Sequence, residues 1–226
     1  MPLNPDAESF AELALDLHEV SSLDETVERV LEFACKMFNC AYAGVILVHE
    51  GSRVETVASN HELVAHLDKV QLEAGEGPDI EIIADRPGVL ICDISEETRW
   101  PRWTAAVEEA GIRSMLGARL YTTRRVLGSL NLYALDVDGF DEVDVDVAHM
   151  LARHAAVALE SARGTEHLQR AVDARNLIGQ AQGILMERFS IDADQAFGVL
   201  KRYSQDNNLK LNSVAQRLID TGRLPS

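Results

Sequence analysis

Long apolar runs are missing from this sequence of 226 residues. The longest candidate, AYAGVILV at positions 41–48, is well short of the ~20 residues that a membrane-spanning helix needs. The first ten residues, MPLNPDAESF, contain neither the basic segment nor the apolar segment of a secretory signal. We therefore expect a cytoplasmic protein without a membrane partner.

Cysteine is scarce, with three residues at irregular spacing: Cys35, Cys40 and Cys92. This number is too small for a disulfide framework or a cysteine-based zinc site, and we interpret Cys35 and Cys40 as ordinary buried thiols. Proline is also missing between Pro101 and Pro225. That interval is therefore open to strands and then to long helices.

Motifs for catalysis are absent as well. The sequence has no G-x-S-x-G elbow, no phosphate-binding P-loop and no dinucleotide fingerprint. The histidine pairs His61/His66 and His149/His154 are each five residues apart, and on a helix this separation turns the second side chain by about 140°. Neither pair can share a metal ion, so the sequence predicts no metal site, no catalytic residue and no enzyme.

Positive charge is in short supply, because 21 lysines and arginines face 37 aspartates and glutamates, for a net charge of −16. The deficit lies in one part of the chain: residues 1–165 hold 13 basic and 30 acidic side chains, whereas residues 166–226 hold 8 and 7. An acidic protein is ordinarily a poor partner for nucleic acid, but this objection does not apply to the second part. The asymmetry predicts two domains, at 1–162 and 163–226.

In the first domain, the spacing of apolar residues predicts a mixture of helices and strands. We expect a helical region at 8–38 with a capping segment at 22–25, then strands at 42–49 and 53–59 joined by a turn at 50–52. Further along we expect a helix at 79–85, a strand at 89–92, a helix at 104–110 and strands at 113–121 and 125–135. This order predicts an α+β fold, a mainly antiparallel sheet flanked by helices. On the last strand, one face should carry Leu127, Ser129, Asn131 and Tyr133.

A long helix is predicted from about residue 143 to residue 188. Gly164 either interrupts this helix, with Thr165 capping the next one, or is tolerated within it at a cost of ~1 kcal/mol. Apolar residues near the end of this helix recur at spacings of three and four, which is typical of a coiled coil and predicts a parallel homodimer. These residues are Ala171, Ala174, Ile178, Ala181 and Leu185.

Two shorter helices should follow, one starting at Asp192 with a capping box to Gln195 and one starting near Asn212 or Ser213 and ending at Gly222. The first of them has an apolar stripe composed of Ala196, Phe197, Leu200 and Tyr203. Together with the end of the long helix, these helices predict a small all-α domain.

The sequence RNLIGQAQGILMER at 175–188 is followed by Ala196-Phe197, Leu200, the polar run SQDNN at 204–208 and Val214-Ala215. This pattern resembles the ANTAR domain, the RNA-binding module of transcription antitermination regulators, over residues 166–222. The resemblance implies a three-helix domain that binds paired stem-loops in nascent mRNA and so prevents the competing terminator from forming. It also implies dimers, in agreement with the coiled-coil spacing.

The cationic, amide and hydroxyl side chains of this domain are the groups available to RNA. Because the domain has almost no net charge, much of the recognition should come from hydrogen bonds to loop bases. Gly179 and Gly183 each cost the helix about 1 kcal/mol relative to alanine, so either another helix approaches closely or RNA reaches the backbone there. Our candidates for RNA contacts are Arg175, Gln182, Gly183, Arg188, Lys201, Arg202, Ser204, Asn207, Asn208, Lys210 and Arg217.

Three segments of the first domain carry a second resemblance: GEGP at 75–78, residues 93–101, and LGSLNLYA at 127–134. They resemble the GAF domain, a fold of small-molecule sensors. The resemblance implies an effector, which no nucleotide or metal motif identifies, and our candidates for its pocket are Trp103, Asn131 and Tyr133. Asp79 stands where many relatives have cysteine, so we expect no thiol-based sensing at that site.

Three functions are compatible with this organisation. The first is a sensor-regulated RNA-binding antiterminator, whose effector alters the long helix. The second is a DNA-binding regulator, since three short helices can form a helix-turn-helix, although the polar connection at 207–211 and the single Arg217 of the last helix oppose it. The third is a ligand-binding module whose last helices only dimerise, and it predicts no affinity for nucleic acid.

Overall fold

The structure, a computed structural model, describes residues 7–20, 22–49 and 54–223, so the turn predicted at 50–52 lies outside the described residues. The chain divides into two compact units, Met1–Gly164 and Thr165–Ser226. Within the described part of the first unit, an antiparallel sheet of five strands has the order β2-β1-β5-β4-β3. The strands are β1 (Tyr42–Val48), β2 (Val54–Ser59), β3 (Gly88–Ile91), β4 (Ser114–Tyr121) and β5 (Val126–Ala134).

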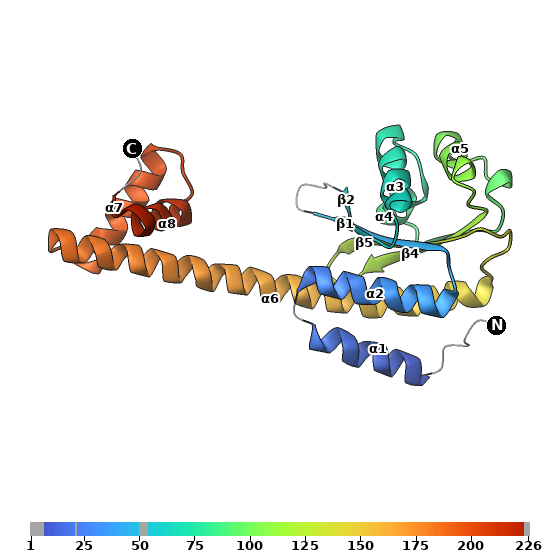
Figure 1. The fold of residues 1–226 in the computed structure, drawn as a ribbon, viewed down its shortest axis with the longest axis horizontal. Helices are drawn as coiled ribbons and strands as arrows, with labels where there is room; N and C mark the ends of the chain where they lie inside the picture. The colour runs from blue at the N-terminus through green and yellow to red at the C-terminus, as the bar shows by residue number, and fades with distance from the viewer. Residues whose placement is uncertain (1–6, 21, 50–53, 224–226) are drawn as a thin grey trace. The chain divides into compact units, whose positions relative to one another are not determined.

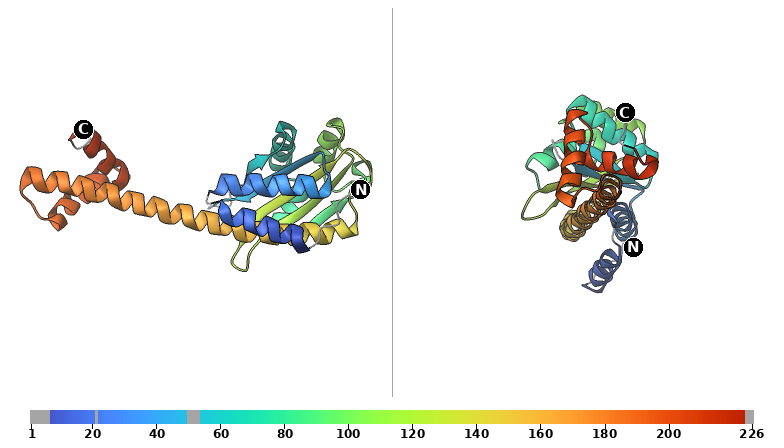
Figure 2. Two further views of the ribbon diagram at one scale, coloured as in Figure 1. Left: turned by 60° about the horizontal axis from the view of Figure 1, so that its bottom comes forward. Right: turned by 90° about the vertical axis from the view of Figure 1, so that its left-hand side faces the viewer.

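Helices cover both faces of this sheet (Figures 1 and 2). One face carries α2 (Leu23–Phe38), α1 (Ala7–Glu19) beyond it, and the first part of α6 (Glu142–Phe189). The other face carries α3 (Glu62–Ala74), α4 (Pro78–Ala84), the short η1 (Ile94–Glu96) and α5 (Pro101–Glu109). The sheet therefore separates two apolar cores, and the predicted α+β class is confirmed.

The predicted capping segment after the first helix is confirmed. Ser22 is in an extended conformation, and its hydroxyl accepts a hydrogen bond from the backbone N–H of Glu25 at 3.1 Å. This bond satisfies one of the free donors at the start of α2 and separates α1 from α2.

The helix α3 was missing from the sequence prediction. Its buried side is formed by Val64, Leu67, Asp68 and Gln71, so two polar side chains occupy positions where an ordinary amphipathic helix would have apolar ones. The resulting loss of apolar periodicity hid the helix, and the same two polar residues belong to the candidate site described below.

The predicted face of β5 is wrong at Leu127. This side chain packs in the core of α2 and α6 with Leu130, whereas Ser129 and Asn131 contact the opposite side of the sheet. The register of β4 and β5 shifts at Leu120/Tyr121, and Gly128 has a φ of 154°. The irregularity inserts one extra residue into β5, so the side chain of Leu127 lies on the opposite face from the one that strict alternation predicts.

In the second unit, the end of α6 packs with α7 (Ala193–Asp206) and α8 (Leu211–Thr221) around a third apolar core. The predicted capping box is confirmed, because Asp192 accepts from the backbone N–H of Gln195 and the Gln195 side chain accepts from that of Asp192. The helix α6 runs without a break through Gly164, so this glycine is tolerated within it.

Candidate functional site

A cluster of polar side chains is buried in the core between the sheet and α3–α5. We call this set, drawn from α3, α4 and β5, the polar cluster: Asp68, Gln71, Asp79, Ser129 and Asn131. Asp79 lies in the first turn of α4, directly after Gly77 and Pro78 of the GEGP segment. The loop therefore inserts a carboxyl group into an otherwise apolar interior.

Asp79 is the centre of the polar cluster. Its carboxyl oxygens accept hydrogen bonds from Ser129 Oγ at 2.6 Å, from Asn131 Nδ2 at 2.9 Å and from the Gln71 amide. Gln71 Oε1 in turn accepts from the backbone N–H of Asp79 at 3.1 Å. The side chain is thus fixed by both α3 and β5.

Burial changes the proton affinity of the two carboxyl groups. Loss of hydration raises the pKa of Asp68 to about 8, and the nearby Asp79 adds to the rise, while the hydrogen bond from Thr56 Oγ1 at 2.7 Å opposes it. Burial also raises the pKa of Asp79, against its three hydrogen bonds. At neutral pH the polar cluster therefore holds at least one proton on its carboxyl groups.

Several polar atoms around the cluster are left without a hydrogen-bond partner among the described residues. They are Asp68 Oδ1, Asn131 Oδ1, the Tyr133 hydroxyl and Trp103 Nε1. An unpaired polar atom in a protein interior costs about 1–3 kcal/mol, so such atoms mark a place where a bound molecule could supply the missing partner. The structure thus brings the three predicted pocket residues into one buried core.

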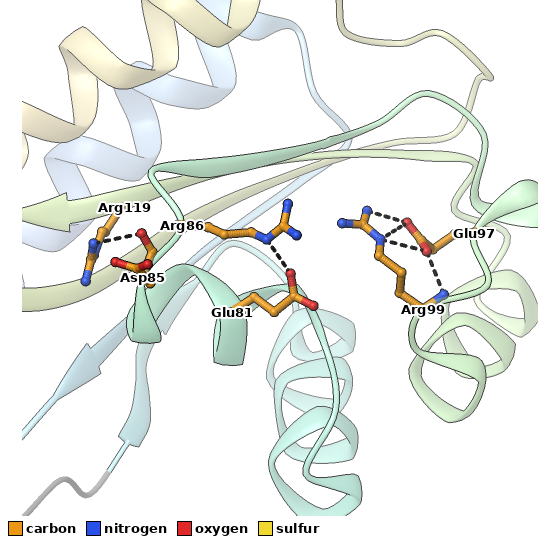
Figure 3. Close-up of polar contacts among 6 residues, drawn as sticks. All are labelled: Glu81, Asp85, Arg86, Glu97, Arg99 and Arg119. Atoms are coloured by element: carbon orange, nitrogen blue, oxygen red, sulfur yellow. Dashed lines mark hydrogen bonds and ion pairs between the residues drawn. The ribbon is translucent and has the colours of Figure 1, made fainter.

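Charged side chains fix the end of α4, which carries Asp79 in its first turn (Figure 3). Arg119 of β4 donates to the carbonyl oxygens of residues 83–85 at 3.1–3.3 Å, where a cation also complements the helix dipole. Arg86, just after the helix, forms an ion pair with Glu81 at 2.6 Å. These contacts limit the freedom of α4 against the sheet.

Four members of the polar cluster were not predicted as site residues from the sequence: Asp68, Gln71, Asp79 and Ser129. One signal was available in the sequence: Ser129 and Asn131 are two positions apart in an otherwise apolar strand, so their polar side chains share one face of the sheet. Nothing in the sequence linked them to α3, because that contact depends on how the helix packs over the sheet.

In the second unit, four of the predicted RNA-contact residues support the fold of the unit. Gln182 donates to the Ala193 carbonyl at 2.9 Å, and Arg188 donates to the Gly222 carbonyl. At the end of α7, Ser204 donates to the Leu209 carbonyl and Asn207, which follows the helix, donates to the Tyr203 carbonyl. Gln182 and Arg188 therefore connect the end of α6 to α7 and to the residue after α8, whereas Ser204 and Asn207 support the turn between α7 and α8.

Five other predicted residues are exposed, and within the described part of the chain no hydrogen bond or ion pair engages their side chains. We call them the unpaired cations: Arg175, Lys201, Arg202, Lys210 and Arg217. Carboxylates of the same unit are engaged elsewhere, Glu166 with Arg170 at 2.7 Å and Asp220 with Gln216 at 2.7 Å. The five unpaired cations thus form no ion pair within the unit, although its basic and acidic side chains are almost equal in number. Asn208, also exposed, lies beside them in the chain with a left-handed φ of 52°.

Two exposed aromatic rings were not among the predicted contacts. Phe189 at the end of α6 is 60% exposed, and Phe197 on α7 is 39% exposed, so Phe197 is not the fully apolar-core residue that the sequence indicated. Phe197 precedes Lys201 by one helical turn. Exposed rings beside cations are the groups on which unpaired bases stack.

Gly179 and Gly183 are not explained by close packing within the chain. Apart from the adjoining backbone of α6 itself, a Cβ atom built at either position has no atom within 4 Å, so α7 and α8 do not approach the backbone there. The first interpretation, close approach of another helix of this chain, is therefore wrong. The backbone at both glycines is open, and an RNA contact at Gly183 stays a prediction.

The predicted coiled-coil residues fall into two groups. Ala181 and Leu185 are buried against α7 and α8, so those positions are occupied within the unit. Ile178 is partly buried on the same core, Ala174 is half-buried and Ala171 is exposed. Two large apolar side chains near Ala171 are exposed as well, Leu168 at 68% and Val172 at 45%.

The first unit is an antiparallel sheet with helices on both faces, and the second is an all-α unit built on the end of the same long helix, so the chain has an α+β unit followed by an all-α unit. The chain belongs to the GAF domain family, which matches residues 20–160. The ANTAR domain matches residues 166–219. Both resemblances identified in the sequence are confirmed.

Solved structures show the same fold in the first unit. The GAF domain of a phosphoenolpyruvate-protein phosphotransferase from Acinetobacter has 17% identity and a TM-score of 0.56, over 71% of this chain and 96% of that one. The corresponding domain from Coxiella burnetii has 16% identity and a TM-score of 0.57, over 71% and 95%. Free methionine-R-sulfoxide reductase from Neisseria meningitidis, in complex with its substrate, has 13% identity and a TM-score of 0.54, over 71% and 95%. At these identities the likeness establishes the fold alone.

A comparison with curated proteins finds no match. GAF and ANTAR domains are typically sensory and regulatory rather than catalytic, although the reductase shows that the GAF fold also occurs in enzymes. None of the described helices combines the length and the apolar composition that crossing a bilayer requires.

Proposed function

We propose that this protein is a signal-responsive RNA-binding antiterminator that binds tandem stem-loops in nascent mRNA and prevents terminator formation. This proposal rests on the ANTAR match over a segment that holds the five unpaired cations. Such cations gain most from phosphate, because no ion pair within the unit has to be broken first.

The unpaired cations would contact phosphates, while the exposed groups near them would contact loop bases. Phe189 and Phe197 offer rings for stacking, and Asn208 offers an amide for hydrogen bonds. Gln182, Arg188, Ser204 and Asn207 would act indirectly, because their side chains already hold the helix ends in place.

A small-molecule effector would act through the polar cluster and the neighbouring Trp103, Asn131 and Tyr133. A ligand that gives partners to the unpaired atoms binds one conformation of the GAF unit better than another and so shifts the population. The helix α6 packs in the core of the GAF unit with its first part and in the core of the ANTAR unit with its last part. It therefore provides a covalent route for the signal.

A homodimer through α6 is the second part of this proposal. Since Ala181 and Leu185 are covered within the chain, the contact between two copies would use Ala171 and Ala174, extended by the exposed Leu168 and Val172. Replacing Leu168 and Val172 by aspartate should give monomers without loss of helicity, because neither side chain supports its own unit. Sedimentation equilibrium and circular dichroism measure both effects, and a retained dimer would exclude this contact.

RNA binding is tested by titration at one fixed salt concentration with tandem hairpins, with the same hairpins carrying scrambled loops, and with duplex DNA. We expect affinity that depends on the loop sequence. The pair Lys201→Ala and Arg202→Ala should weaken binding about tenfold or more and lower the salt dependence, since two phosphate contacts are lost.

The matched control removes the same charge from the other unit, with Arg102→Ala and Arg124→Ala, and should leave RNA affinity unchanged. Preference for duplex DNA would favour the DNA-binding regulator. No binding to any nucleic acid, both in the full chain and after deletion of residues 1–140, would favour a module that only dimerises.

A further inference from the structure

The end of the β4–β5 hairpin lies beside α6 in both views of Figure 2, and a groove of about 640 Å³ runs between them. Residues 121–124 of the hairpin form one wall, and the other wall includes Arg153, Val157 and Glu160 of α6. All of these residues belong to the first unit. The groove is open to solvent and borders the part of α6 that packs on the opposite face of the sheet from the polar cluster, so it is a separate site.

The two walls of the groove are joined by contacts between side chains. Arg153 Nη2 donates to the Tyr121 hydroxyl at 3.2 Å, and its guanidinium carbon lies 5.9 Å from the centre of the Tyr121 ring. Arg125 Nε and Glu160 Oε1 form an ion pair at 3.5 Å. The Thr122 N–H donates to the Arg125 carbonyl at 2.9 Å and closes the end of the hairpin. The groove therefore exists before any ligand binds, so little ordering of the chain opposes binding.

Positive charge gathers at this groove although the unit as a whole is acidic. Residues 1–165 hold 13 basic and 30 acidic side chains. Three of the basic ones lie at or beside the groove, Arg124, Arg125 and Arg153, and Glu160 is the carboxylate that accompanies them. No side chain of the described residues forms an ion pair with Arg124 or Arg153. Their guanidinium groups therefore retain N–H donors for an anionic ligand.

The hydroxyl groups of the hairpin add further donors. Thr122 Oγ1 accepts from the Arg124 N–H at 3.3 Å and keeps its own proton for a ligand, and the neighbouring Thr123 also lines the groove. A phosphate monoester offers three terminal oxygens to such a set of donors, whereas a carboxylate offers two oxygens and less charge. The donors of the groove therefore favour a phosphate group.

An apolar surface adjoins these donors. The Val157 side chain is 65% exposed and the Tyr121 side chain is 37% exposed, and both line the groove. A ligand with an apolar or aromatic part would remove this surface from water while its charged end meets the arginines.

We propose that the groove between the β4–β5 hairpin and α6 binds a phosphate monoester whose remaining part is apolar or aromatic. The phosphate contacts Arg124, Arg153 and the hairpin hydroxyls, and the apolar part covers Val157 and Tyr121. Because Arg153 and Val157 belong to α6, a bound ester favours the conformations of the GAF unit in which α6 and the hairpin keep this spacing. An effect of the ester on RNA binding through α6 would rest on the function proposed above, whereas the binding itself does not.

Calorimetric titration of the full chain without RNA, at one fixed low salt concentration, tests the proposal with three probes: phenyl phosphate, inorganic phosphate and phenol. We expect saturable binding of phenyl phosphate, about tenfold tighter than that of inorganic phosphate, because only the ester covers Val157 and Tyr121. Phenol lacks the charge and should bind more weakly than either anion. Equal affinity for the ester and inorganic phosphate, phenol binding as tight as that of the ester, or no binding of the ester would each overturn the proposal.

Single substitutions test whether the ester lies in this groove. Arg124→Ala should weaken the binding of phenyl phosphate about tenfold, and Arg124→Lys, which keeps the charge, should weaken it less. Val157→Asp places a carboxylate in the groove and should abolish binding, and circular dichroism checks that this exposed substitution leaves the fold intact. Arg102→Ala removes an exposed cation of the same unit that does not line the groove, and it is the matched control. Unchanged binding in Arg124→Ala, or an equal loss in Arg102→Ala, would overturn the proposal.

The ester titrations and the RNA titration give independent results. RNA is absent from the first, so a lack of ester binding leaves the proposed RNA binding intact, and a lack of RNA binding leaves the proposed groove intact. The ester is absent from the second, so the charge control there, which includes Arg124, is unaffected.

Discussion

The two units of this protein place their polar side chains in opposite ways. The GAF unit carries most of the acidic residues, yet its distinctive polar groups, such as Asp68 and Asp79, lie inside the core. The ANTAR unit has almost balanced charge, yet its cations, such as Lys201 and Arg202, lie at the surface without partners. Net charge therefore says little about either site, and the position of each charged group decides what it can bind.

The same contrast predicts whether each unit depends more on pH or on salt concentration. Burial raises the pKa values of Asp68 and Asp79 because water cannot solvate the charged carboxylates, so the stability of the GAF unit should depend on pH. Exposed cations are screened by salt at distances beyond ~10 Å at 0.1 M ionic strength, so RNA binding by the ANTAR unit should respond to ionic strength.

The largest effect is expected when the centre of the polar cluster is removed. Asp79→Ala leaves Gln71, Ser129 and Asn131 with unpaired donors, at about 1–3 kcal/mol each, so the free energy of unfolding should fall by about 3 kcal/mol or more. Asp79→Asn retains one acceptor oxygen, so its free energy of unfolding should fall by less than that of Asp79→Ala. Urea unfolding followed by tryptophan fluorescence measures this, since both tryptophans lie in that core.

The exposed residue Asp146 supplies the control for this experiment. Asp146→Ala should change the free energy of unfolding by less than about 0.5 kcal/mol, as is usual for surface positions. Equal losses in Asp146→Ala and Asp79→Ala would remove the distinction between buried and exposed carboxylates drawn above.

A smaller, pH-dependent effect is expected at Asp68. Folding raises the pKa of Asp68 from 3.8 to about 8, so at pH values between these two limits the chain takes up a proton when it folds. The free energy of unfolding therefore falls as the pH rises toward 8. Asp68→Asn mimics the protonated form and removes this loss. Relative to wild type it should gain stability with rising pH, by at most about 1.4 kcal/mol per pH unit, in urea unfolding at pH 4 to 8. Parallel pH profiles would show that Asp68 is not protonated in the native core.

The smallest effect concerns the open glycines of α6. Gly183→Ala and Gly164→Ala should each raise the free energy of unfolding by up to about 1 kcal/mol, because the added Cβ meets no atom within 4 Å apart from the adjoining backbone of α6. Only Gly183→Ala should also weaken RNA binding, since only Gly183 lies in the ANTAR unit. Thermal unfolding and the hairpin titration measure the two effects, and unchanged RNA affinity in Gly183→Ala would exclude contact at that backbone.

Much of the fold follows from short-range patterns. The cap at Ser22, the capping box from Asp192 to Gln195 and the end of α8 at Gly222 were predicted because each depends on residues within a few positions of one another. The charge asymmetry and the motif at 175–188 likewise depend on composition and local order, so the sequence alone identifies both domain families.

Tertiary structure alone decided which residues meet. Asp68, Asp79 and Asn131 come from α3, α4 and β5, and no local pattern states that these elements pack together. The irregular pairing at Gly128 reversed the face of Leu127, and packing of α7 and α8 covered Leu185, which its spacing alone assigned to a dimer contact. Side-chain spacing defines a face of a helix or strand, but the neighbour that covers this face is chosen by the packing of the whole unit.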